Sequence, residues 1–145
     1  MEENVIFELE GKVDLPLFFS KDKIYAWFEL IAEHYQVEIG ELNFIFCDDT
    51  TILDVNRKYL NHDYFTDVIT FDYKVANILN GDIYISLDTV LSNSALFSVS
   101  YEEEFHRIIC HSLLHLIGFK DKSEEDSIVM TTNENKCLEL LTTLV

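Results

Sequence analysis

The sequence predicts an α+β domain in which helices cover one sheet. Strand-like segments lie in the first half and the middle of the chain, and the two longest helical segments come late. The 145 residues are 48% hydrophobic, which is enough for one core but leaves little room for a second. Only four glycines and one proline occur, and there is no repeat. We therefore expect one domain over residues 1–145.

The first half of the chain predicts two strands and two helices. Residues 4–9 form a short apolar run that is typical of a strand. Hydrophobic residues recur at helical spacing over 21–36, directly after Ser20, which is a good N-cap. The apolar and aromatic segment 42–47 predicts a second strand. Capping residue types then precede a helix over about 50–59.

The middle of the chain predicts two more strands and one helix. Segment 67–73 has the composition of a strand. Asn80 and Gly81 predict a turn before another strand over 82–86. A weaker helical pattern follows over 88–97.

Two long helices end the chain. Ser100 and Glu103 form a capping-box pattern that opens a helix running to about Ile117. Gly118 stands where a helix C-terminal glycine belongs. A looser start signal of the same kind precedes the last helix, over about 124–143.

The end of the first long helix carries the pattern H-x-x-x-H-x-x-G-x-x-D. His111 and His115 are four residues apart, so they lie on one helix face. Gly118 lets the chain leave the helix and turn back, so that Asp121 can reach the same ion. Imidazole and carboxylate are ordinary zinc ligands, and three protein ligands leave a fourth position open for water. The pattern predicts a catalytic metal site, although two histidines at this spacing also occur on ordinary helices.

The residue after the first histidine separates this pattern from a known class of peptidase. Zincins have similar ligand spacing but need a glutamate there as the general base. This chain has Ser112, which has no useful basicity near neutral pH. We therefore expect a metal hydrolase of another kind.

The composition of the chain limits which kinds of partner it can bind. The net charge of −17 repels polyanions and, taken alone, argues against a nucleic acid partner. However, seven of the ten basic residues lie from Arg57 onward, and Lys120 and Lys122 flank Asp121. These two lysines are candidates for contact with phosphate. The three widely spaced cysteines are expected to be reduced and buried, and no apolar run is long enough to span a membrane, so we expect a cytoplasmic protein.

Several segments resemble the YbeY family of endoribonucleases, the rRNA maturation factors of bacteria. Residues 111–121 are similar to the family's H-G-x-L-H-L-x-G-Y-D-H signature. The other matching parts are segments 65–71 and 81–86, the pair Asn56 and Tyr59, and the pair Met130 and Glu134. The match covers roughly residues 42–140 in one order, which is far more specific than the histidine pair alone.

The resemblance implies a zinc-dependent endoribonuclease, specific for single-stranded RNA, that acts in 16S rRNA 3′-end maturation and ribosome quality control. It also implies a central, mostly parallel sheet of about four strands flanked by helices. The partners would be single-stranded rRNA and the ribosome, with no membrane. His111, His115 and Asp121 would hold Zn²⁺ with its bound water. The residues name no general base, and the oligomeric state stays open.

Three positions depart from the family pattern. Asp121 stands where the family has a third histidine ligand, so the site carries one more negative charge. Leu60 stands where the family has an arginine, so a phosphate contact there would fall to Lys58 or Arg57. Ser112 replaces a glycine, which is a modest change on a helix.

Four further polar residues have two interpretations each, and a fifth, His106, has one. His62 could neighbour the metal or be an ordinary loop histidine, whereas His106 points away from the ligand face and is expected to be structural. Asp67 and Asp82 match family motifs, yet each could simply pair with backbone at a strand start. Glu104 could support a ligand, although a solvated helix start is the favoured interpretation.

Two other functions stay open. A ribosome-assembly binding protein with a structural metal and little nuclease activity is favoured by the net charge and by Leu60. The open coordination position favours the enzyme. The second alternative is a metal hydrolase with a small-molecule or peptide substrate, and Ser112 counts against the peptide version.

Overall fold

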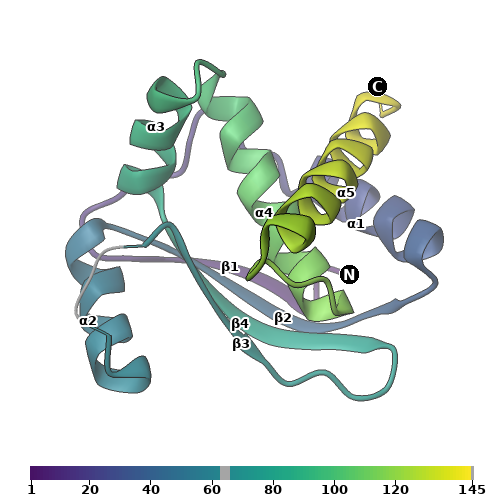
Figure 1. Ribbon diagram of the computed structural model, residues 1–145, viewed down its shortest axis with the longest axis horizontal. Helices are drawn as coiled ribbons and strands as arrows, with labels where there is room; N and C mark the ends of the chain where they lie inside the picture. The colour runs from purple at the N-terminus through teal and green to yellow at the C-terminus, as the bar shows by residue number, and fades with distance from the viewer. Residues whose placement is uncertain (63–65, 145) are drawn as a thin grey trace.

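The computed structural model describes residues 1–62 and 66–144. Within them the chain forms the strands and helices in the order predicted from sequence (Figure 1). The elements are β1 (Val5–Glu10), α1 (Lys21–Tyr35), β2 (Glu38–Cys47), α2 (Asp49–Leu60), β3 (Val68–Asp72), β4 (Ile78–Ser86), α3 (Leu87–Leu96), α4 (Tyr101–Ile117) and α5 (Glu124–Thr142). Phe65, which belongs to one of the family-like segments, lies outside the described residues.

The four strands form one mixed sheet in the order β1-β2-β4-β3. β1 pairs parallel to β2, and β2 pairs parallel to β4. β3 lies antiparallel to β4 at the outer edge. The expectation of an α+β domain with a central, mostly parallel sheet flanked by helices is therefore confirmed.

Helices cover the two faces of the sheet unequally. Figure 1 shows α1, α4 and α5 on one side of the sheet and α2 on the other. The main core lies on the first side, where Leu113, Leu114 and Leu116 of α4 are completely buried. The indole Nε1 of Trp27 donates to the Cys137 carbonyl over 2.7 Å, which links α1 to α5. A smaller cluster, between α2 and the sheet, consists of Cys47, Ile52, Val55 and Ile69.

The helix starts follow the local capping chemistry of the sequence. The side chain of Ser100 accepts a hydrogen bond from the Glu103 backbone N–H over 3.0 Å, at the start of α4. Ser123 and Asp126 form a reciprocal capping box at the start of α5. Each cap satisfies backbone donors that the first helical turn leaves unpaired. None of the described helices combines the length and the hydropathy needed to cross a bilayer.

The predicted turn at Asn80 and Gly81 is wrong, because both residues lie inside β4. The chain reverses earlier, where Val75 and Ile78 exchange backbone hydrogen bonds of 3.2 and 2.9 Å. Gly81 is required by a close approach rather than by a turn. A Cβ at this position would lie 2.7 Å from the carbonyl oxygen of Phe71 on β3. The turn was predicted from the residue types at positions 80 and 81 alone. Glycine is needed there because a neighbouring strand lies close to it.

Gly81→Ala should therefore destabilise the fold by about 1–3 kcal/mol, because the added methyl forces β3 away from β4. Urea denaturation measures the change. Asn77→Ala is the control, since Asn77 is exposed in the connection between β3 and β4 and should shift stability by less than about 0.5 kcal/mol. Equal effects of the two substitutions would contradict the close approach.

Candidate metal centre

A cavity of about 540 Å³ lies beside α4, on the side of the main core. Its walls come from the segment before β3, the turn after α3, one face of α4, the loop after α4 and one face of α5. His111 and Asp121, two of the three predicted ligands, line it. His115 does not line it and is exposed.

The side chain of His111 is held by a carboxylate from the last helix. The Nδ1 atom of His111 lies 2.6 Å from Oε2 of Glu134. The other oxygen of Glu134, Oε1, accepts from Nη1 of Arg107 over 3.1 Å. Arg107 precedes His111 by one helical turn, so α4 binds both oxygens of one carboxylate of α5. When Nδ1 carries the proton that Glu134 accepts, Nε2 of His111 is left with a free lone pair.

Opposing effects act on the pKa of His111. Burial by itself lowers the pKa, because it disfavours the charged imidazolium. The hydrogen bond and the charge of Glu134, together with the charges of Asp121 and Asp67, outweigh burial and raise the pKa. The site therefore favours positive charge at this position, whether that charge is a proton or a metal ion.

Asp67 and Glu104 face the same cavity, as does Glu103. Burial raises the pKa of Asp67, whereas the charge of His111 lowers it. Glu104 is only 5% exposed, and burial together with the charge of Asp67 raises its pKa. The expectation that Glu104 lies in a solvated helix start is therefore wrong. The cavity combines carboxylates with few cations, which is an environment suited to a bound cation.

His115 and Asp121 are positioned by the end of α4. Gly118 ends the helix with φ of 130°, and its N–H donates to the carbonyls of Leu114 and His115. Both side chains are exposed, so packing does not hold them in one rotamer. In the described part of the chain, no three His, Cys, Asp or Glu side chains are gathered as a group that could hold a metal. The three predicted ligands therefore stay a prediction.

The predicted phosphate contacts lie outside the cavity. Lys58, Lys120 and Lys122 are all exposed, and none of them lines it. Lys120 and Lys122 nevertheless flank Asp121, which does. Arg107 lines the cavity, but its Nη2 donates to Oδ1 of Asn135 over 2.9 Å while Nη1 binds Glu134.

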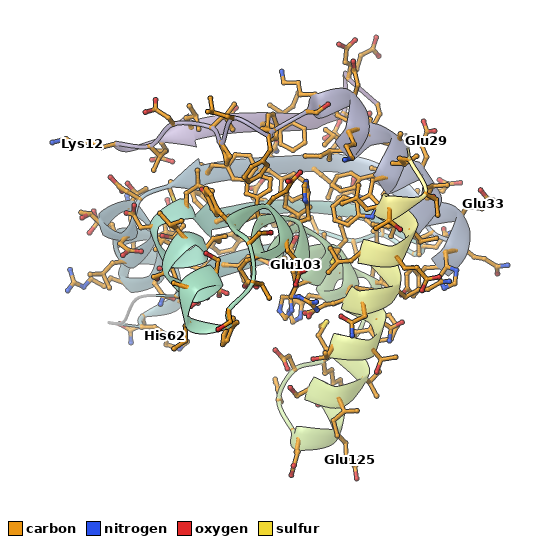
Figure 2. All side chains as sticks on the ribbon, turned by 90° about the horizontal axis from the view of Figure 1, so that it is seen from above. Lys12, Glu29, Glu33, His62, Glu103 and Glu125 are labelled. Atoms are coloured by element: carbon orange, nitrogen blue, oxygen red, sulfur yellow. The ribbon has the colours of Figure 1, made fainter. Side chains whose placement is uncertain are left out.

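The two remaining histidines of interest lie away from this cavity. His62 is exposed after the end of α2, and Figure 2 shows it well apart from Glu103, which lines the cavity. His106 is 5% exposed, and its ring packs edge-on against Trp27 with centroids 5.6 Å apart. His106 is therefore structural, as expected.

Sequence reasoning named Glu134 only as a match to a family pattern and did not assign Arg107 any role. The position of Arg107 near the site could have been predicted from the sequence, because it lies four residues before His111 and so shares its helix face. No such spacing places Glu134 there, since 23 residues separate it from His111. Its role depends on how α5 packs against α4.

Comparison with known proteins places the chain among bacterial relatives. The family profile of endoribonuclease YbeY matches residues 9–142. The endoribonuclease YbeY of Parabacteroides distasonis is 46% identical over 129 residues, which cover 89% of this chain and 90% of the relative. That of Porphyromonas gingivalis strain W83 is 47% identical, over 93% of this chain and 88% of the relative. The solution structure of TM1509 from Thermotoga maritima has a TM-score of 0.63 at 25% identity and covers 94% of this chain and 88% of TM1509.

Replacing Glu134 by glutamine should lower the pKa of His111, because the substitution removes the charge that raises it. An NMR pH titration of the His111 ring in chelator-treated protein measures the pKa. Glu103→Gln is the matched control, since Glu103 pairs with Arg107 at 3.8 Å but does not contact His111. An unchanged pKa in the Glu134 variant would contradict the assigned hydrogen bond.

Proposed function

The chain belongs to the endoribonuclease YbeY family, and from this premise we propose that it is a zinc-dependent endoribonuclease that cleaves single-stranded RNA. We assign Zn²⁺ to His111, His115 and Asp121. The observation that carries the proposal is the 2.6 Å contact between His111 Nδ1 and Glu134 Oε2. Histidines that ligate metals commonly bind a carboxylate through the other ring nitrogen, which fixes the ring and makes it a better ligand.

The donor set fits zinc by chemical type. Two imidazole nitrogens and one carboxylate oxygen match the ligands of catalytic zinc sites, which keep one position open. The cavity carboxylates add negative charge around the site, which favours a divalent cation. Bound zinc supplies Lewis acidity, which polarises a phosphoryl oxygen and activates water near neutral pH.

The residues of the chain have separate tasks in this proposal. Glu134 orients the His111 ring, and Arg107 in turn holds Glu134. Asp67 and Glu104 face the cavity, and their raised pKa values bring their basicity closer to neutral pH. We assign to this pair the task of accepting the proton from the attacking water.

RNA contact falls to lysines outside the cavity, because the cavity carboxylates repel phosphate. Lys120 and Lys122, next to Asp121, are the proposed phosphate contacts, and Lys58 takes the place of the arginine that Leu60 replaces. We further propose that the substrate is ribosomal RNA, cleaved in 16S rRNA 3′-end maturation and ribosome quality control. Membership of the family supports this assignment.

A second candidate function is a ribosome-assembly factor with a structural metal and little nuclease activity. The net charge of −17 favours it, because the summed charge opposes RNA binding. Leu60 favours it as well, since leucine cannot bind phosphate. The metal is catalytic in the first candidate function and structural in the second. Mutation of a proposed ligand can distinguish the two roles.

The His115→Ala variant should lose the zinc that the wild type holds at about one ion per chain. RNA cleavage should fall by at least about a hundredfold, because the metal contributes several kcal/mol to the transition state. Elemental analysis of purified protein and cleavage of a labelled single-stranded RNA give the two readouts. His34→Ala is the control, since His34 is exposed at the end of α1. Wild type without zinc, even after zinc is supplied, would refute the assigned site.

The Asp121→Ala variant separates the two candidate functions. Since Asp121 is exposed and outside the core, the enzyme should stay folded but lose cleavage. A protein with a structural metal should instead lose metal-linked stability. Thermal denaturation with and without zinc, alongside the cleavage assay, makes the distinction. A large loss of stability with cleavage retained would contradict the enzyme proposal.

A further inference from the structure

A second cavity lies on the face of the sheet opposite the metal centre. Its volume is about 210 Å³, and we call it the aromatic pocket, lined by Tyr59, Phe71, Tyr73, Asp82 and Tyr84. These residues come from the end of α2, from β3 and the turn after it, and from β4. α2 is the helix that Figure 1 shows on this side, and the pocket lies at the border of the area that α2 covers.

Three rings of the aromatic pocket, those of Tyr59, Phe71 and Tyr84, pack against one another. Phe71 lies edge-to-face with Tyr59 at a centroid distance of 5.9 Å and with Tyr84 at 6.1 Å. Tyr59 and Tyr73 nevertheless remain 60% and 57% exposed. An aromatic side chain that a neighbour holds in place but that stays open to solvent, as Tyr59 does, is suited to stack on a flat ligand, because little entropy is lost when the ligand binds.

The charged group in the aromatic pocket, beside the tyrosine hydroxyls, is a hydrogen-bond acceptor. Oδ1 of Asp82 accepts from the amide of Asn43 over 2.9 Å. A carboxylate cannot donate, so it discriminates in favour of partners with N–H groups. The exocyclic amino group of cytosine is such a partner, whereas uracil presents a carbonyl oxygen at the same position.

Two lysines, Lys58 and Lys74, directly adjoin tyrosines of the aromatic pocket in sequence. Nζ of Lys58 lies 5.7 Å from the centroid of the Tyr59 ring. Lys74 follows Tyr73 and reaches the other way, where its Nζ donates to the carbonyl of Ile117 over 3.3 Å. Ile117 is the last residue of α4, two positions after His115. Among the described strands, β3 is an outer one with a strand neighbour on one side only, so it lies at the border between the two faces of the sheet.

We propose that the aromatic pocket binds a base of the single-stranded RNA substrate and prefers bases that carry an exocyclic amino group. The inference rests on the proposed function, since it takes RNA as the substrate. Exposed aromatic rings, an acceptor and neighbouring lysines match the face, the edge and the backbone of a nucleotide. The aromatic pocket therefore selects which segment of RNA is drawn across the metal centre.

Equilibrium binding tests this proposal with the full chain. The probes are 5′-labelled decamers of 2′-O-methyl cytidine and 2′-O-methyl uridine, followed by fluorescence anisotropy and checked on a gel for integrity. The wild type should bind the cytidine probe more tightly. The double variant Tyr59→Ala/Tyr73→Ala should bind that probe at least about tenfold more weakly, as expected for the loss of base stacking. Leu17→Ala is the control, since Leu17 is fully exposed and does not line the aromatic pocket.

Two further variants keep the test sharp. Tyr59→Phe/Tyr73→Phe should retain binding, because it keeps the rings and loses only the hydroxyls. Asp82→Asn should bring the affinities for the two probes to within about twofold, because an amide can pair with either base. Unchanged binding in the alanine double variant, or an unchanged cytidine preference in Asp82→Asn, would overturn the proposal. So would a wild type that binds neither probe.

Failure of this inference is distinguishable from failure of the proposed function. Zinc content and RNA cleavage are measured in parallel on the same preparations. The alanine double variant should hold as much zinc as the wild type, because neither tyrosine lines the metal cavity. Absence of zinc from the wild type would refute the metal centre and leave the binding comparison intact. Equal probe affinities would refute the aromatic pocket, whatever the zinc content.

Discussion

The carboxylate of Glu134 is the constraint on which the candidate site depends. It is 7% exposed, and a buried carboxylate is tolerated only when hydrogen bonds and opposite charge compensate for the lost water. Arg107 and His111 provide that compensation from two successive turns of α4. The requirement to pair one buried charge therefore fixes the register of α5 against α4. The same pairing determines which nitrogen of His111 is presented to the cavity.

The position of α4 makes this arrangement possible. One face of the helix contributes Leu113, Leu114 and Leu116 to the core, so the helix cannot rotate without exposing them. At its C-terminal end the helix stops at Gly118, and the chain then turns so that Asp121 lines the cavity. The rigid part of the site is thus built into the core, whereas His115 and Asp121 remain at the surface. In the proposed site, one ligand is therefore fixed by the core and the other two are exposed, which suits a site that must admit a substrate.

Much of the architecture could be predicted from the sequence because its causes are local. Ser100 and Ser123 begin helices by binding backbone N–H groups three residues away, and the spacing of His111 and Asp121 places both at one cavity. The failures have causes that are distant in sequence. Gly81 is explained by the Phe71 carbonyl on the neighbouring strand, and the burial of Glu104 depends on the segments that enclose the cavity. The pairing of Glu134 with His111 likewise needs the folded arrangement of two helices.

The two outer strands of the sheet also determine how copies of the protein behave towards one another. Unpaired strand edges promote aggregation, because they can add a strand from another molecule. β3 is only five residues long, and β1 presents exposed Glu8 and Glu10 along a strand of six. Like charges would face each other if two copies met edge to edge, and the net charge of −17 adds long-range repulsion. The negative charge of the chain thereby opposes association between copies and gives the protein colloidal stability at high concentration.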